Sequence, residues 1–145
     1  MQLQTVNRSD AEKIFGAFTN AAGATVTTGY AVCFTTTAAS VNGINAVLPA
    51  TGQLRTFAGI CTSDVADNQV GLFQAYGYNG SVFYFAEATS VSITTADHGL
   101  GPGPASLGVG ATGLSFTQGP VILLNSVGAV IRSAGGYVTG FIKAM

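Results

Sequence analysis

The single histidine of this 145-residue chain, His98, is the first side chain to consider for chemistry, because it follows directly after Asp97. A zinc site needs three or four ligands, and no such cluster of ligating residue types surrounds this pair in the sequence. A serine hydrolase would need an activated nucleophile, and the G-x-S-x-G pattern that presents one is absent. We interpret His98 as a loop histidine, and we predict that the protein is not an enzyme.

Two further patterns are typical of cofactor or cation sites. Residues 108–113 spell G-x-G-x-x-G, but a dinucleotide site also needs a preceding strand, a following helix and a later acidic residue. A Gly/Pro-rich segment comes before this pattern instead, and no acidic residue follows Asp97. Asp64, Asp67 and Asn68 offer calcium-type oxygen ligands, but the EF-hand spacing is absent and an exposed acidic turn is favoured. The sequence therefore predicts no cofactor and no metal site.

The low charge of the chain limits its partners. Charged residues make up 8% of the sequence, whereas soluble domains average about 25%. A net charge of −1 provides no basic surface for nucleic acid, and no apolar run approaches the roughly 18–20 residues of a membrane-spanning helix. Because β-branched and turn residues dominate over helix formers, we predict a mainly β protein that buries its charge-poor surface against protein partners, with neither nucleic acid nor membrane as a partner.

The two cysteines, Cys33 and Cys61, lack C-x-x-C spacing. The polar N-terminal sequence does not match a secretory signal, which favours a reducing compartment. We therefore expect two buried free thiols rather than a disulfide.

The N-terminal part of the chain predicts an extended arm followed by one short helix. Residues 1–8 show no strong periodicity, and we expect them to form an arm that contacts a partner through Met1, Gln2, Leu3, Gln4, Thr5, Val6, Asn7 and Arg8. Ser9 and Glu12 match a helix capping box. Apolar residues then follow at helical spacing: Ala11, Ile14, Phe15 and Phe18. The helix is expected to end between residues 20 and 23.

The rest of the chain predicts a single β-rich domain over residues 9–145, in the form of a small β-barrel or β-sandwich. Strand-like runs alternate with turn residues at positions 24–27, 30–35, 47–48, 54–62, 69–78, 91–95, 114–117, 121–124, 129–132 and 137–143. Residues 96–108 are rich in Gly and Pro, so a loop is expected there.

The strongest local signal is the dipeptide Asn79-Gly80, which is typical of a type I′ hairpin turn. A hairpin closed at this dipeptide would be apolar on both faces, because of the residues that flank it. Only one of these faces can enter the core of its own subunit. The other face needs a second sheet or a neighbouring chain. We therefore predict subunit contacts at the residues along one side of the ribbon, namely Gln74, Tyr76, Tyr78, Phe83 and Phe85.

Four segments of the chain resemble the head decoration (cement) proteins of tailed bacteriophages. They are DAEKIF at 10–15, FAGI at 57–60 with the Asp-Val-Ala turn that follows, QAYGY at 74–78 and GFIKAM at 140–145. The resemblance implies a homotrimer that is assembled in the host cytoplasm, binds the major capsid protein on the exterior of the virion and performs no chemistry.

A second hypothesis is a β-sandwich receptor- or glycan-binding module of a phage tail or fibre. Exposed aromatic side chains would then form platforms for sugar rings, at Tyr76, Tyr78, Tyr84 and Tyr137. The chain contains no tryptophan, which favours the capsid hypothesis over this one.

Overall fold

The computed structural model describes residues 12–36, 43–49, 56–86, 90–93, 99–103, 106–109, 120–124, 128–131 and 135–144. This part of the chain is mainly β and contains no helix. Its strands are β1 (Ile14–Asn20), β2 (Ala31–Phe34), β3 (Asn45–Val47), β4 (Phe57–Cys61), β5 (Val70–Ala86), β6 (Ser90–Ile93), β7 (Gly99–Gly103), β8 (Ser106–Val109), β9 (Val121–Leu123), β10 (Gly128–Ile131) and β11 (Gly135–Lys143). The mainly β prediction is confirmed.

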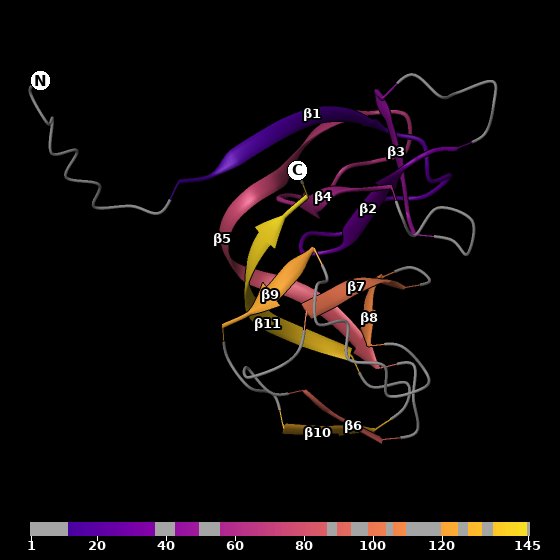
Figure 1. Cartoon of the computed structure of the whole chain (residues 1–145). Coiled ribbons are helices and arrows are strands. Elements are labelled where there is room, and N and C mark those ends of the chain that lie inside the picture. The colour runs from indigo at the N-terminus through magenta and orange to yellow at the C-terminus, as the bar shows by residue number, and fades with distance from the viewer. Residues whose placement is uncertain are drawn as a thin grey trace, which may run out of the picture.

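Five of the described strands close into a barrel (Figure 1). β1 pairs antiparallel with β5 and parallel with β3, and β2 and β4 complete the ring between β3 and β5. Closure removes the two free edges that an open sheet of these strands would have, and this limits edge-to-edge association. Of the two predicted β architectures, the barrel is the one observed.

β5 is the strand around which the rest of the chain is arranged. It is 17 residues long and continues beyond the barrel to pair antiparallel with β11. β11 pairs with β9, β9 with β7, β7 with β8, and β8 returns to the end of β5. These pairings form a second closed circuit that shares β5 with the barrel, whereas β6 and β10 form a separate two-stranded sheet (Figure 1).

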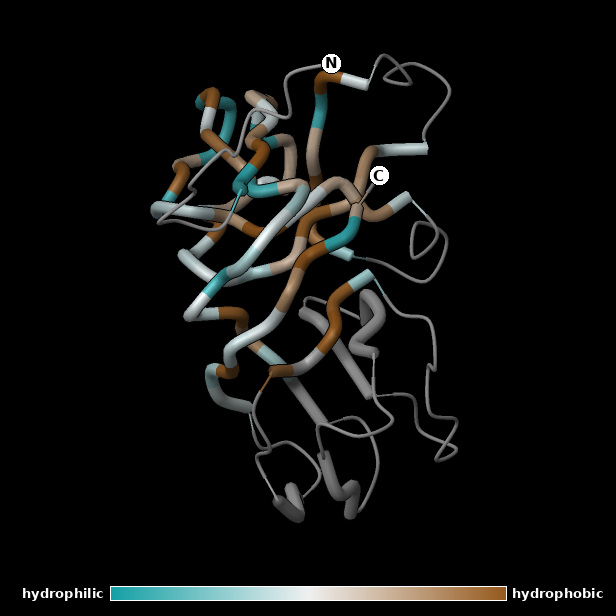
Figure 2. Tube along the Cα trace, turned by 60° about the vertical axis from the view of Figure 1, so that its left-hand side comes forward, coloured by the Kyte–Doolittle hydropathy of each residue, from teal (hydrophilic) through white to brown (hydrophobic). Residues whose placement is uncertain are grey.

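The barrel core is built around Phe73, which is fully buried. The Phe18 ring packs against it with ring centroids 5.8 Å apart and meets the Phe34 ring edge-to-face at 4.9 Å. Hydrophobic positions recur along the strands rather than gathering in one segment (Figure 2). Cys33 and Cys61 are buried free thiols, as predicted, and burial raises the pKa of Cys33 to about 12.

The predicted N-terminal helix is wrong within the described residues, because Ile14–Asn20 is strand β1. A single helical turn or two gains little without tertiary packing, whereas β1 hydrogen-bonds along β5 from Ile14↔Tyr76 to Thr19↔Val70. The buried Asn20 side chain then fixes the loop that follows, donating to the carbonyls of Ala24 and Val65, both at 2.8 Å. The arm at 1–8 and the capping residue Ser9 lie outside the described residues.

The predicted hairpin at Asn79-Gly80 is also wrong, because both residues lie inside the continuous strand β5. Neither has the positive φ that a type I′ turn requires. Asn79 pairs with Gly140 and Val82 with Val138, so two residues of β5 lie opposite Thr139 alone, which is a β-bulge. The Asn79 Oδ1 accepts a hydrogen bond from the Ser81 N–H at 2.8 Å within this bulge.

The bulge has a consequence for the aromatic side chains of β5. One extra residue reverses the alternation of faces, so Tyr76 and Tyr78 before it point to the same side of the sheet as Phe83 after it. The β11 partners of these three residues are Lys143, Phe141 and Tyr137, which alternate with the buried Val138 and Ile142. The predicted common side for Tyr76 and Phe83 is therefore present, although no hairpin produces it.

Two other expectations fail at the level of the backbone. Residues 96–108 contain the strands β7 and β8, which pair with each other and join β9 to β5. Residues 24–27 form a loop with one isolated bridge, Val26↔Val65. The expected strand at 114–117 lies outside the described residues, and the remaining predicted strands overlap observed ones.

Candidate functional site

An exposed apolar surface crosses four neighbouring strands. We call it the aromatic face, and it consists of Ile14, Tyr76, Tyr78, Ile122 and Phe141. Cross-strand pairing builds it from two rows: Ile14 beside Tyr76, and Tyr78 beside Phe141, which in turn pairs with Ile122. The Tyr76 and Phe141 rings meet edge-to-face at 5.1 Å. The exposed fraction is 41% for Tyr78 and 49% for Ile122. A contiguous exposed apolar surface of this kind is typical of protein contact sites.

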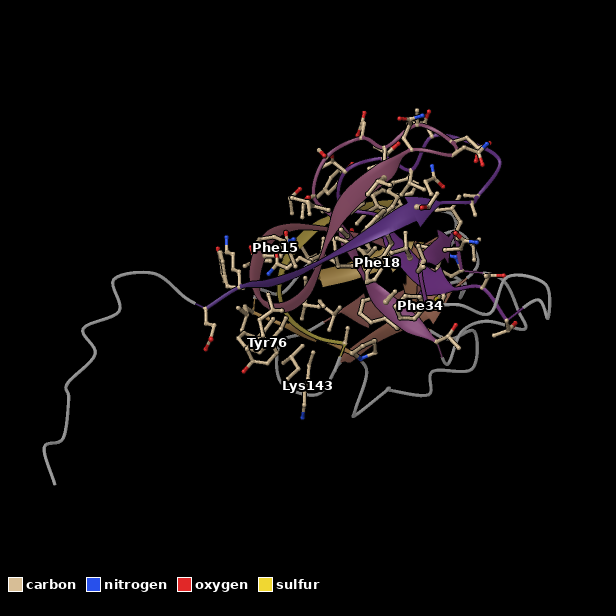
Figure 3. All side chains as sticks on the ribbon, turned by 90° about the horizontal axis from the view of Figure 1, so that it is seen from above. Phe15, Phe18, Phe34, Tyr76 and Lys143 are labelled. Carbon is tan, nitrogen blue, oxygen red and sulfur yellow. The ribbon has the colours of Figure 1, made fainter. Side chains whose placement is uncertain are left out.

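The aromatic face is bordered by lysines. Lys143 pairs with Tyr76 at the end of its row, and the two side chains lie next to each other (Figure 3). The Lys13 Nζ lies 6.0 Å from the centroid of the Tyr78 ring, at the outer limit of a cation–π contact. Lys13 and Lys143 are the only basic side chains in the described part of the chain. The rim of this face is therefore positively charged.

Gln74 holds the bend of β5 beneath the aromatic face. Its side chain is 2% exposed, and its Nε2 donates to the carbonyls of Tyr76 and Tyr78 at 3.1 and 3.0 Å. Its Oε1 accepts from the Asn79 Nδ2 at 3.1 Å. Gln74, one of the predicted contact residues, is thus buried in its own chain and acts on this surface only through the backbone that carries the two tyrosines.

Gly77 lets β1 approach β5 at the same place. Its φ of 102° is one that side-chain-bearing residues rarely adopt. A Cβ at this position would collide with the Glu12 carbonyl oxygen and lie 3.1 Å from the Lys13 Cα. The close approach positions Lys13 and Ile14 beside the tyrosines, so this glycine is a condition for the aromatic face.

A second exposed apolar surface lies on the outside of the barrel where β5 begins. We call it the aliphatic face, and it consists of Ala17, Val70 and Leu72. Ala17 pairs with Leu72 across the two strands, and Val70 and Leu72 are 69% and 55% exposed. The backbone N–H and the hydroxyl of Thr62 both donate to the Leu72 carbonyl, at 3.3 and 2.7 Å. The turn at 62–69 therefore borders this face.

The acidic side chains of that turn tie two loops together. The Asp64 Oδ1 accepts hydrogen bonds from the backbone N–H and the hydroxyl of Thr28, at 2.8 and 2.9 Å. These bonds, the backbone one above all, lower the pKa of the Asp64 carboxyl below its ordinary value. The Asp67 Oδ1 accepts from the Gly23 N–H at 2.9 Å. The exposed acidic turn is present as expected, and no group of three or more metal-ligating residues occurs among the residues that the structure describes.

Phe83 belongs to a third aromatic group, separate from Tyr76 and Tyr78. Its ring stacks on Tyr30 at 4.8 Å and meets the Tyr137 ring at 5.4 Å. Tyr137 is 53% exposed, whereas Tyr84 is 6% exposed and faces the interior. Phe85 lies in β5, paired with Gly135. Of the predicted contact residues, the structure thus brings Tyr76 and Tyr78 together and leaves Phe83 elsewhere on the same side of the sheet.

Several sequence-level candidates lie outside the described residues, among them His98, Asp97 and most of the glycine pattern at 108–113, whose first two residues end β8. Within the described ranges, no helix has the length and apolar character needed to cross a membrane. No protein-family model, curated protein or solved structure matches the chain. The described features that bear on function are the two exposed apolar faces and the oppositely charged residues of the segments that border them.

Proposed function

We propose that this chain is a structural protein of a bacteriophage head, which binds the outside of the capsid as a homotrimer and stabilises the shell. Its partners are the major capsid protein and further copies of itself, and its place is the exterior of the virion. In this proposal the arm at residues 1–8 contacts the capsid.

One observation carries the proposal. Three of the four segments that resemble decoration proteins contribute to the aromatic face: 10–15 supplies Lys13 and Ile14, 74–78 supplies both tyrosines, and 140–145 supplies Phe141 and Lys143. These segments are far apart in the sequence, and strand pairing gathers them on one exposed surface. Solvent-exposed apolar area costs about 25 cal/mol per Å² relative to buried area, so a face of this kind favours a protein partner.

The direct test is co-sedimentation with empty capsids assembled from the major capsid protein of the same phage. We expect saturable binding by the wild-type protein. We expect reduced binding by Tyr78→Ala, because a change in the aromatic face weakens the oligomer that attaches to the shell. The matched control is Tyr137→Ala, the same change at an exposed tyrosine outside the aromatic face. Wild-type protein that pellets no more than an unrelated protein of similar size would refute the proposal.

Glycan binding is the second candidate function, and the exposed Tyr137 favours it. The Tyr137 ring packs against Phe83, which in turn stacks on Tyr30. Such a module uses exposed rings as platforms, and the burial of Tyr84 removes that residue from the set. A glycan array separates the two functions. Retention of the wild-type protein on a glycan, with loss in Tyr137→Ala and not in Tyr78→Ala, would favour the alternative.

A further inference from the structure

We propose that the aromatic face of one copy binds the aliphatic face of the next copy, so that the subunits associate head to tail in a closed ring. This inference rests on the self-association in the proposed function and names the two surfaces that make it. Each face binds one partner, which is the unlike face of a second copy of the same chain.

The two faces are separate surfaces on one strand. Val70 and Leu72 lie at the start of β5, and Tyr76 and Tyr78 lie beyond Gln74, which is buried. β5 is strongly curved (Figure 1). The part of β5 that connects Leu72 with Tyr78 contains an extra residue in its pairing with β1 and, at Gly77, a positive φ. A contact between two different patches of identical subunits is heterologous, and it gives either a closed ring or an open filament.

Charge decides which faces pair. The aromatic face has Lys13 and Lys143 at its rim, with Glu12 as the neighbouring acid, so two lysines and one glutamate leave one net positive charge. The aliphatic face is bordered by the turn that carries the acidic residues Asp64 and Asp67, whose Oδ1 atoms accept hydrogen bonds from Thr28 and Gly23. Two aromatic faces would bring lysines together, and two aliphatic faces would bring aspartates together. Only the pairing of unlike faces places opposite charges around two apolar patches.

The two faces also carry different kinds of apolar side chain. The aromatic face offers the rings of Tyr76, Tyr78 and Phe141 beside Ile122, whereas the aliphatic face offers the branched side chains of Val70 and Leu72 beside Ala17. Aromatic rings bury large apolar areas when they pack against such side chains. Closure of the ring leaves neither face exposed.

A charge exchange between the faces tests the pairing. Lys143→Glu places a carboxylate at the aromatic rim, where it meets the acidic turn of the next copy. Leu72→Lys places an ammonium on the aliphatic face, where it meets the lysines of the previous copy. Both positions are exposed, so the fold tolerates the changes, and circular dichroism checks this. If Leu72→Lys does not fold, Val70→Lys, at a side chain that is 69% exposed, takes its place.

The readout is subunit dissociation, measured by light scattering coupled to size exclusion over a dilution series. We expect each single change to raise the dissociation constant by about tenfold or more, as like charges at a contact do. The double variant should recover most of that loss, because the two introduced charges then face each other. Singles that leave the oligomer unchanged, a double variant no tighter than the weaker single, or a wild-type monomer would each overturn the pairing.

The result is separable from the capsid assay. A wild-type oligomer that shows the charge rescue but does not co-sediment with capsids would refute the capsid function and leave the pairing of faces intact. Conversely, capsid binding by a protein whose oligomer ignores all three variants would refute the pairing alone.

Discussion

Replacing Gly77 by alanine tests how the aromatic face is held in place. The residue has a φ of 102°, and forcing a non-glycine residue into such a region costs about 1–3 kcal/mol. The added Cβ also collides with the Glu12 carbonyl and comes within 3.1 Å of the Lys13 Cα. Relief requires the start of β1 to move away, and each backbone hydrogen bond lost there costs about 1 kcal/mol. We therefore expect Gly77→Ala to destabilise the protein by about 2–4 kcal/mol.

The matched control is Gly80→Ala in the same strand. Gly80 lacks a positive φ, and the nearest atom to its added Cβ is the Tyr78 hydroxyl oxygen at 3.7 Å, an ordinary contact. We expect this change to alter stability by less than about 1 kcal/mol. Urea unfolding of both variants at one fixed protein concentration measures the difference, because self-association otherwise shifts the midpoint. Equal stability of the two variants would refute the role assigned to Gly77.

Three further predictions follow from the described geometry and the proposal. Cys33 and Cys61 are buried, and Cys33 has a pKa raised to about 12, so a thiol reagent at neutral pH should label both only after denaturation; rapid labelling of the native protein would contradict the packing. The hydrogen bonds from Thr28 lower the pKa of Asp64, so the stabilisation by this carboxylate is present above the ordinary carboxyl pKa and is lost as the pH falls through the lowered pKa. Asp64→Asn should therefore lose less stability in acid than the wild type. Thermal unfolding across that pH range measures the difference, and parallel profiles of the two proteins would refute the prediction. Deletion of residues 1–8 should leave fold and oligomer intact and weaken capsid attachment, and wild-type occupancy by the truncated protein would show that the arm has no docking role.

The sequence predicts the strand positions better than it predicts how the strands pair. β2, β4 and β9 are short apolar runs bounded by turn residues, and local composition is enough to place them. Ile14–Asn20 is different, because Ile14, Phe15 and Phe18 fit a helical face as well as a strand. Its state is decided by pairing with β5, more than fifty positions later in the sequence, and local propensity carries no information on such contacts.

The hairpin prediction fails for a related reason. Asn-Gly favours a turn when the flanking strands have only each other to pair with. Here β11 supplies a longer partner from the far end of the chain. Asn79 pairs with Gly140, and Gly80 enters a bulge in β5 instead of a turn. The Gly-rich strands β7 and β8 show the same effect, since a ladder of backbone hydrogen bonds can form where propensity opposes it.

The candidate surface could be predicted only in part. Tyr76 and Tyr78 are visible as aromatic residues in a strand that is apolar on both faces, but Phe141 and Ile122 join them through pairings that no local pattern specifies. The aliphatic face was missed, although a signal exists. Val70 and Leu72 alternate with Gly71 and the core residue Phe73, and a strand that is apolar at both sets of alternate positions has one set without a partner in its own chain.

A cryo-electron density map of empty capsids of the same phage, with and without the added protein, shows whether and where the protein binds the shell. We expect additional density on the outer surface of the shell, in clusters of three subunits, with the N-terminal arm at the contact with the major capsid protein. Capsids that show no added density at saturating protein, or density bound elsewhere on the virion, would contradict this expectation.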